Sequence, residues 1–288
     1  MKVFFKHISI LILMLSIGVV ILNNLYDYVF LNTSPRGKLQ LAIKQEQEHV
    51  DYLFLGNSRV ENYIDCSIIE AASGKICKNY AMSGSSYQDA FVLLKLLKRS
   101  GLTYDHLFIQ LDPSLKNEAM TKSFRASLVP FVNSHDIHVD HVELNFSPAE
   151  DHLPFYKYAK YDYLYGVRAC IAQLYKNTSE DVELGYVAQY HTSNNNSGML
   201  EDFALKNRYT ELIKKEAVND KAEIHFFTSP YCPDMDNTVV FNKLTSFYPG
   251  YINYSSFYEE SDYFANCTHM NDKGAQVFTK QIIKDFNL

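Results

Sequence analysis

A short apolar run that ends in a glycine and a serine constrains the fold more than any other stretch of this chain. Residues 51–56 read Asp-Tyr-Leu-Phe-Leu-Gly, which is typical of a buried strand that stops at a breaker. Apolar residues then recur at near-helical spacing over residues 60–73, and Gly74 is suited to end that helix. A strand that leads through Gly-Asn-Ser into a helix places Ser58 at the carboxyl edge of a sheet, where open α/β sheets bind ligands. The alternative is a serine that only helps to cap the helix.

Strand and helix patterns alternate on both sides of this stretch. The clearest helix covers residues 87–100 and is closed by Gly101. Such alternation with short loops predicts an α/β fold with a parallel, three-layer, flavodoxin-like sheet. The other strands are expected at residues 75–81, 105–112, 222–230 and 251–254, and the other helices at residues 199–217, 238–247 and 275–286.

The alternation fails between residues 113 and 198, which are polar, aromatic and irregular apart from a helix expected at residues 155–175. A segment of this kind in an α/β domain is typical of an insertion that shapes a substrate site or a partner surface. Its tyrosines at positions 156, 158, 161, 163 and 165 are expected to divide between the core and the cleft. The predicted organisation is an anchor at residues 1–24, a membrane-proximal connector at 25–49 and an α/β domain at 50–288 that carries this insertion.

The N-terminal segment predicts a transmembrane helix. Lys2 and Lys6 precede residues 8–22, which are apolar and uncharged. Counted from Val3, the apolar stretch is about 20 residues long, roughly enough to cross a bilayer. Residues 21–25 are bulky and offer no small-residue cleavage site, so we expect an uncleaved signal anchor with the C-terminal domain outside the cytoplasm. A cleaved signal peptide is the alternative.

Composition sets broad limits. The chain has 288 residues, of which 47% are hydrophobic, which is enough for one substantial core plus an insertion. The net charge is −6 and basic residues form no block, so no nucleic-acid partner is expected. The many tyrosines and phenylalanines suit a core, with a carbohydrate-facing surface as the alternative.

Cysteines and histidines were considered as covalent or metal sites. Cys66 and Cys77 are placed so that they can pair across the first helix and second strand, but the preferred interpretation of all five cysteines is buried small hydrophobic residues. His135, His138 and His141 invite a metal site, yet at this spacing on one helix they would diverge by about 60° per step. We therefore expect a solvated surface there, and neither a metal nor a cofactor.

Three blocks of the sequence together resemble the SGNH (GDSL-type) hydrolase superfamily. They read Gly-Asn-Ser at residues 56–58, Asn-Tyr-Ala-Met-Ser-Gly at 79–84 and Asn-Cys-Thr-His at 266–269. In that superfamily a Gly-Asp-Ser block supplies a nucleophilic serine, a glycine of the second block helps to bind the oxyanion, and an Asp-x-x-His block supplies the base. The resemblance covers about residues 50–112 and 222–288. Position by position, it implies Ser58 as nucleophile, Gly84 as oxyanion glycine and His269 as base.

The sequence departs from the superfamily pattern at three places. Asn57 stands where aspartate is usual, and Asn266 stands where the superfamily has its acidic residue. The third block, usually Gly-x-Asn-Asp, reads Leu-Asp-Pro-Ser at residues 111–114, so no asparagine donor is present. Asp112 and Ser114 are the candidates for its place in the oxyanion hole.

The resemblance implies acyl transfer through a serine ester. His269 would take the proton from Ser58, and the backbone N–H groups of Ser58 and Gly84 would bind the oxyanion. The side chains of Ser58 and His269 are expected to lie within about 2.6–3.2 Å of each other. Asn266 would present its oxygen to His269, with Asp262 or Asp272 as the alternative acid at the ring.

Together with the anchor, this resembles membrane proteins that add or remove acyl groups, acetyl above all, on bacterial envelope polysaccharides. The expected function is therefore an extracytoplasmic esterase or O-acyltransferase. The alternative is a catalytically inactive relative that serves in envelope polysaccharide assembly or glycan binding. The expected partners are a glycan or acyl-ester substrate, the membrane through the N-terminal helix, and envelope-biosynthesis proteins.

Overall fold

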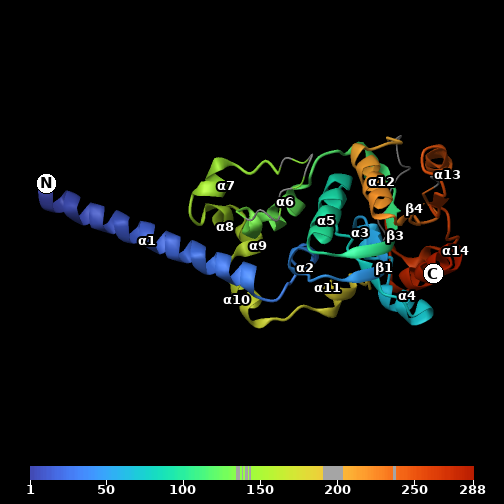
Figure 1. The fold of residues 1–288 in the computed structure, drawn as a ribbon, viewed down its shortest axis with the longest axis horizontal. Coiled ribbons are helices and arrows are strands. Elements are labelled where there is room, and N and C mark those ends of the chain that lie inside the picture. Colours follow the sequence, from blue (N-terminus) through green and yellow to red (C-terminus); the bar gives the residue numbers. More distant parts are fainter. Residues whose placement is uncertain (134–136, 138, 140–141, 143, 191–203, 236–237) are drawn as a thin grey trace. The chain divides into compact units, whose positions relative to one another are not determined.

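A five-stranded parallel sheet confirms the predicted α/β fold (Figure 1). The computed structural model describes residues 1–133, 137, 139, 142, 144–190, 204–235 and 238–288. The strand order is β2-β1-β3-β4-β5, and every neighbouring pair is parallel, which is the flavodoxin-like order. The strands are β1 (His49–Leu55), β2 (Cys77–Asn79), β3 (Thr103–Gln110), β4 (Glu223–Thr228) and β5 (Ile252–Asn253).

By internal packing the chain divides into two compact units. The first comprises residues 1–36 and 125–178, and the second comprises residues 37–124 and 179–288. The second unit holds the whole sheet and all of the candidate site residues. Helices outside the sheet's two flanking layers, several of them short, are α2 (Lys38–Lys44), α3 (Ser58–Glu61), α6 (Lys122–Ser127), α11 (Glu180–Leu184) and α13 (Thr238–Asn242), with 3₁₀ turns at Pro113–Lys116, Lys243–Ser246 and Ser261–Tyr263.

The sheet of the second unit lies between two helical layers. Figure 1 shows α5 (Tyr87–Arg99) and α12 (Arg208–Asp220) on one side, and α4 (Cys66–Ser73) and α14 (Asp272–Phe286) on the other. Strand residues become more deeply buried toward their carboxyl ends, and Phe54 of β1 stacks on Phe108 of β3 with ring centroids 4.4 Å apart. Burial on both faces explains the apolar runs Leu53–Leu55 of β1 and Leu107–Ile109 of β3.

Two helices that the sequence predicts as continuous are broken. Residues 60–73 form α3 and α4 because Asp65 caps a new helix, its side chain accepting a hydrogen bond from the N–H of Ser67 at 3.0 Å. Residues 155–175 form three pieces, and Gly166, in an extended conformation, separates the last two. The helix expected at 199–217 begins only at Arg208, with residues 199–203 outside the described part. The histidines at 135, 138 and 141 also lie outside it.

The first unit is built on the C-terminal part of the long apolar helix. Its helix α1 (Lys2–Asn32) continues past the point where the sequence analysis ends the anchor. Tyr26, Val29 and Phe30 of α1 are buried against aromatic residues of the 125–178 segment, among them Tyr158 and Tyr165. The remaining elements of this unit are a 3₁₀ turn at Val129–Phe131, α7 (Pro148–His152), α8 (Tyr156–Lys160), α9 (Asp162–Tyr165) and α10 (Val167–Tyr175).

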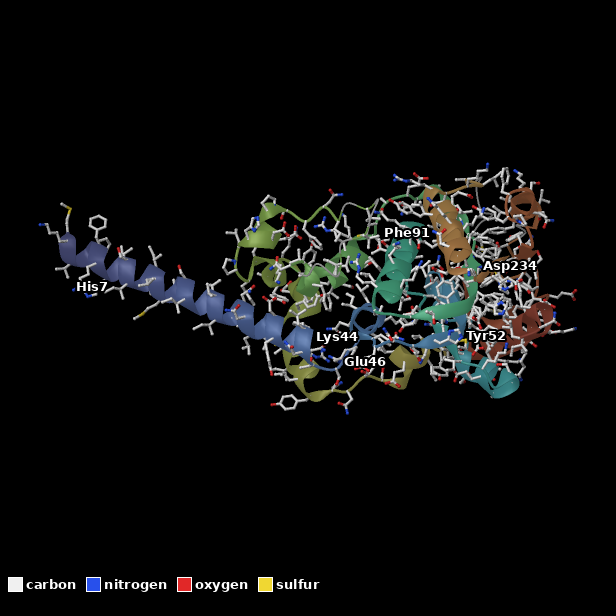
Figure 2. All side chains as sticks on the ribbon, in the orientation of Figure 1. His7, Lys44, Glu46, Tyr52, Phe91 and Asp234 are labelled. Atoms are coloured by element: carbon white, nitrogen blue, oxygen red, sulfur yellow. A yellow bond between two sulfur atoms is a disulfide. The ribbon has the colours of Figure 1, made fainter. Side chains whose placement is uncertain are left out.

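Most of α1 has no protein around it. Its most apolar 18-residue window has a mean hydropathy of 2.4 and no buried residue, so one N-terminal helix is long and apolar enough to span a membrane. Figure 2 shows side chains on all sides of the helix along this stretch, His7 among them. Of the insertion's tyrosines, 158, 161 and 165 are buried, as predicted for those in the core, whereas 156 and 163 are exposed to solvent.

Four of the five cysteines form disulfides. Cys66 pairs with Cys77, and Cys232 pairs with Cys267, while Cys170 is a buried free thiol. The interpretation of the cysteines as buried small hydrophobic residues is therefore wrong for four of them. The Cys232–Cys267 pair was not anticipated because its members are 35 residues apart and meet only once the sheet has formed.

Candidate active site

Ser58 stands in the first turn after β1 because two residues before it shape that turn. A Cβ atom on Gly56 would lie 2.6 Å from Cγ2 of Val60, so glycine lets the strand pass close to the helix that follows. Asn57 is the N-cap of α3, and its Oδ1 accepts a hydrogen bond from the backbone N–H of Arg59 at 3.0 Å. The helix therefore begins at Ser58, at the carboxyl edge of the sheet, as the sequence predicted.

His269 reaches the same edge from a short hairpin before the last helix. The strands β6 (Phe264–Asn266) and β7 (His269–Met270) pair antiparallel, with Asn266 opposite His269. The hydroxyl of Tyr63 donates to the carbonyl of Thr268 at 2.6 Å, which ties the hairpin to the segment after α3. Asn271 then caps α14, with its Oδ1 accepting a hydrogen bond from the backbone N–H of Gly274 at 3.0 Å. The hairpin itself was not predicted.

The serine, histidine and asparagine side chains form one line of hydrogen bonds. Ser58 Oγ lies 2.8 Å from Nε2 of His269, within the expected range. On the other side of the ring, Nδ1 of His269 lies 3.2 Å from Oδ1 of Asn266. All three side chains are half-buried.

Thr268 determines which way the Asn266 amide points. Oδ1 of Asn266 accepts from the backbone N–H of Thr268 at 3.0 Å and from its hydroxyl at 2.9 Å. Because a backbone N–H can only donate, the atom that faces it must be the amide oxygen. The same oxygen faces Nδ1 of His269, so Nδ1 carries the ring proton and Nε2 offers its lone pair to Ser58. That is the tautomer a general base requires.

In the described part of the chain, neither alternative acid is hydrogen-bonded to the His269 ring. The Asp272 carboxylate accepts hydrogen bonds from Tyr186 at 2.7 Å and from Gln276 at 2.9 Å. Asp262 contributes its backbone carbonyl to Asn271. Within the described residues, the hydrogen-bond partners of Nδ1 of His269 are Asn266 and Thr268. Of the two expected arrangements, the structure holds the one with Asn266 at the ring.

The electrostatic surroundings disfavour a charged imidazole. Burial lowers the pKa of His269, and the nearby positive charge of Arg59 lowers it further. In a Ser-His-Asp triad the carboxylate would oppose both effects, but the amide of Asn266 brings no charge. His269 is therefore a neutral acceptor for the serine proton over a wider pH range, at the expense of weaker stabilisation of the cation formed during reaction.

Arg59 is a buried cation beside the site. It is 5% exposed, and its Nη2 donates to the carbonyls of Ser229 and Pro230 at 2.6 and 2.7 Å. Its guanidinium lies over the ring of Tyr231, 3.5 Å from the centroid. Among the described residues, no carboxylate forms a salt bridge with Arg59, and its Nε and Nη1 have no hydrogen-bond partner. The positive potential of such a group favours an anion forming nearby.

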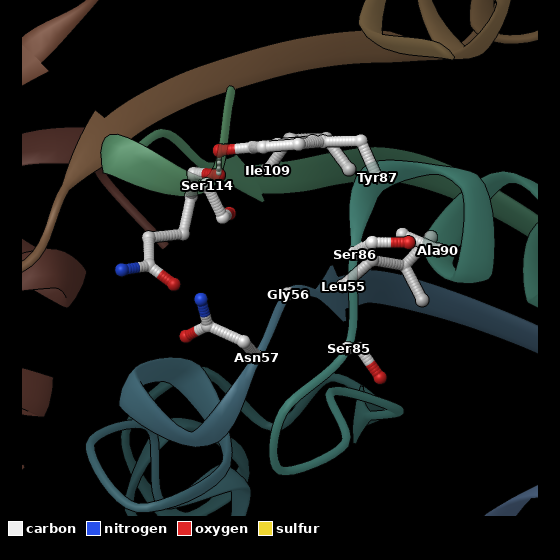
Figure 3. Close-up of a pocket in the computed structure, with 10 residues that line it drawn as sticks. Leu55, Gly56, Asn57, Ser85, Ser86, Tyr87, Ala90, Ile109 and Ser114 are labelled. Atoms are coloured by element: carbon white, nitrogen blue, oxygen red, sulfur yellow. Dashed lines mark hydrogen bonds between the residues drawn. The ribbon is translucent and has the colours of Figure 1, made fainter. Parts of the chain in front are cut away.

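Asp112 and Ser114 are joined to each other and to Asn57. Asn57 Nδ2 donates to Asp112, whose carboxylate also accepts from the backbone N–H of Ser114 at 2.8 Å and from its hydroxyl. Asn57, Ser86 and Ser114 are among the residues that line a small cavity (Figure 3), and the cavity has room for about one water molecule. Asp112 acts here as an acceptor that links the loops after β1 and β3.

A buried ion pair connects α3 to the loop that carries Gly84. Lys38 Nζ lies 2.9 Å from Glu61 Oε1, and also donates to the carbonyls of Ala81 and Gly185. The other carboxylate oxygen of Glu61 accepts hydrogen bonds from the backbone N–H and the hydroxyl of Ser83. Because Glu61 belongs to the same short helix as Ser58, this arrangement holds the second-block loop in register with that helix.

Gly84 lies in the turn next to this attachment. Its φ of 75° is in the left-handed region that favours glycine, and the residue is exposed. In the described part of the chain, no hydrogen bond joins Gly84 to Ser58 or His269, and neither the Ser58 N–H nor the Gly84 N–H has a protein partner. Both N–H groups are thus free to receive an acceptor.

The roles of several residues that shape the site could not be predicted from the sequence. Arg59 and Glu61 act through partners that are distant in the sequence. Thr268 acts through its backbone N–H, which any residue other than proline would supply there. The disulfide of Cys232 with Cys267 joins the loop after β4 to the His269 hairpin, and the backbone N–H of Cys232 also donates to the carbonyl of Cys267 at 3.2 Å. The one available hint was the position of Cys267, two residues before His269.

No protein family model matches the sequence, and no curated protein matches it. Among solved structures, a protein from Streptococcus pneumonia provisionally named a platelet activating factor is 11% identical, with a TM-score of 0.40, and the match covers 97% of this chain and 99% of that one. A carbohydrate esterase whose active site has divergent catalytic and non-catalytic binding functions is also 11% identical, with a TM-score of 0.35, covering 88% of this chain and 66% of that one. These similarities do not establish a family.

The site predicts the effect of restoring the acid at position 266. In Asn266→Asp, the carboxylate should accept the same hydrogen bonds and add a negative charge that stabilises the imidazolium. We expect kcat/KM on a small acyl ester to rise. When a Ser-His-Asp triad loses its acid, the rate falls about 10⁴-fold because the histidine takes the wrong tautomer. The rise expected here is much smaller, because His269 already has the correct tautomer.

The pH profile should change in a defined direction. In the wild type the acid limb of kcat/KM should lie below the ordinary histidine pKa of about 6.5, since burial and Arg59 lower the pKa of His269. The carboxylate in Asn266→Asp should move that limb to higher pH. An unchanged acid limb in a folded, active variant would show that His269 is not the titrating base.

Proposed function

We propose that this protein is a serine esterase or O-acyltransferase of the SGNH type, acting on acyl, and specifically acetyl, esters of a bacterial cell-envelope glycan. The observation that carries the proposal is the 2.8 Å contact of Ser58 Oγ with His269 Nε2, with the ring proton directed to Asn266. A serine hydroxyl becomes an effective nucleophile when a positioned base takes its proton. The site lies at the carboxyl ends of β1 and β3, where the loops that follow the two strands run in opposite directions. Flavodoxin-like sheets bind ligands at this point.

The proposed reaction runs in two halves. Ser58 Oγ attacks the acyl carbonyl carbon while its proton passes to Nε2 of His269, and the oxyanion accepts hydrogen bonds from the N–H groups of Ser58 and Gly84. As the intermediate collapses, the carbon–oxygen bond to the leaving alcohol breaks and His269 returns the proton to that alcohol. Water or an acceptor hydroxyl then attacks the acyl-serine by the reverse steps. Attack by water makes the protein an esterase, and attack by an acceptor hydroxyl makes it a transferase.

A catalytically inactive relative that binds glycans is the second candidate. Two observations favour it: Asn266 brings no charge, and Arg59 disfavours the imidazolium of His269. Both weaken the proton-accepting half of the mechanism while leaving the binding surface intact. Activity measurements on matched variants separate the two candidates.

Release or transfer of acetate from envelope polysaccharide tests the proposal. We expect the wild type to release or transfer acetate and Ser58→Ala to lose that activity, because no other hydroxyl contacts His269 Nε2 among the described residues. Ser123→Ala, which alters an exposed serine of α6, is the matched control and should retain activity. Equal rates for the wild type and Ser58→Ala, on a substrate that the wild type binds, would favour the glycan-binding candidate.

The proposed location is the cell membrane, with a single span and the α/β unit outside the cytoplasm. Lys2 and Lys6 precede the apolar part of α1, which favours a cytoplasmic N-terminus. The two disulfides support an oxidising compartment for the second unit.

A reporter fused after Leu288 tests this orientation. We expect alkaline phosphatase to be active there and a reporter that works only in the cytoplasm to be silent. The reverse pattern would contradict the proposed topology.

A further inference from the structure

A second cluster of reactive side chains lies at the opposite end of the sheet from Ser58. His106 belongs to β3, and Glu223 and His225 belong to β4, which pairs with it. In the register, His106 is opposite Glu223 and Phe108 is opposite His225. All three lie toward the beginning of their strands, whereas Ser58 follows the end of β1. The proposed acyl chemistry does not use this cluster.

The ligand atoms of the three residues lie close together, with one atom of each within 4.8 Å of the other two. His106 Nδ1 lies 3.1 Å from His225 Nε2 and 3.6 Å from one carboxylate oxygen of Glu223, and His225 Nε2 lies 3.8 Å from the other oxygen. In a tetrahedral zinc site with bonds of about 2.0–2.1 Å, neighbouring ligand atoms are about 3.3 Å apart. The two nitrogens are close to this spacing, and a movement of the Glu223 carboxylate would bring one of its oxygens to the third corner of a tetrahedral face.

Aromatic packing holds the two imidazoles in place. His225 stacks on Phe108 with ring centroids 4.5 Å apart and meets the edge of Phe286 at 5.1 Å. His106 packs beside Tyr52, with centroids 5.5 Å apart. Rings fixed in this way direct their nitrogens toward a common point before any metal arrives, which lowers the cost of binding.

Exposure of the cluster leaves a route for a cation from solvent. The His225 side chain is 14% exposed and that of His106 is 28% exposed, whereas Glu223 is 66% exposed and can close over the site. A plain hydrogen bond between the two imidazoles would account for their 3.1 Å contact alone. Glu223 adds a carboxylate within 4 Å of both of these nitrogens, so the cluster offers a third ligand beside the two imidazoles.

We propose that His106, Glu223 and His225 form a binding site for a divalent zinc ion. Two imidazole nitrogens and one carboxylate are a ligand set that zinc uses in proteins, with a water molecule in the fourth position. Because the ligands come from two neighbouring strands, the ion joins β3 to β4. It binds the folded chain only, so it stabilises the fold by mass action.

Calorimetric titration of the full chain without a histidine tag, in detergent, with zinc chloride tests this site. We expect one saturable site in the wild type. His106→Ala and His225→Ala should each weaken binding by at least about tenfold, since even indirect partners of metal ligands have effects of 10–100-fold. Glu223→Gln removes one ligand charge at an exposed position. This variant should therefore fold normally but bind zinc more weakly than the wild type.

Two histidine variants serve as matched controls. His49→Ala changes an exposed histidine on β1, near Asp105, and His138→Ala changes one of the insertion histidines. Both should bind zinc as the wild type does. Zinc should also raise the unfolding temperature of the wild type but not that of the double variant of His106 and His225.

Three results would overturn the proposal: no saturable zinc binding by the folded wild type, binding unchanged in Glu223→Gln and His225→Ala, or binding lost in one of the controls instead. Ser58→Ala should bind zinc as the wild type does. The zinc site and the proposed acyl chemistry can therefore fail independently of each other.

Discussion

The parallel pairing of β1 with β3 is the constraint on which the candidate site depends. After β1 the chain continues to β2 on one side of this pair, and after β3 it continues to β4 on the other side. The loops that follow β1 and β3 therefore separate at the carboxyl edge of the sheet. One loop presents Ser58 and the other presents Asp112. The hydrogen bond from Asn57 to Asp112 joins the two loops directly. A register slip would point these strand residues to the other face and remove the site.

The proposed base, His269, comes from a different part of the chain and is held by independent attachments. Tyr63 fixes the hairpin through the carbonyl of Thr268, and a disulfide connects Cys267 to the loop after β4. This rigid support explains how an amide can serve at position 266, because the orientation of the His269 ring does not depend on a carboxylate. What the amide does not supply is charge. With Arg59 nearby, the site therefore favours a neutral base and a developing anion over an imidazolium.

The sequence predicted what depends on local pattern and missed what depends on distant partners. Strand-like patterns and their alternation with helices located all five sheet strands, and the three-residue offset located Asn266 beside His269. The breaks at Asp65 and Gly166 were missed because apolar spacing continues across them. The burial of Arg59 could not be predicted either, since its carbonyl and aromatic partners are about 170 residues away.

Covalent labelling of the full chain with a fluorophosphonate tests the central claim most directly, because the probe reacts only with a serine that a neighbouring base activates. The account predicts one adduct, located on Ser58 by peptide mass spectrometry, formed much more slowly in His269→Ala and faster in Asn266→Asp. Folded wild-type protein that takes up no label, or that is labelled at another serine, would contradict it.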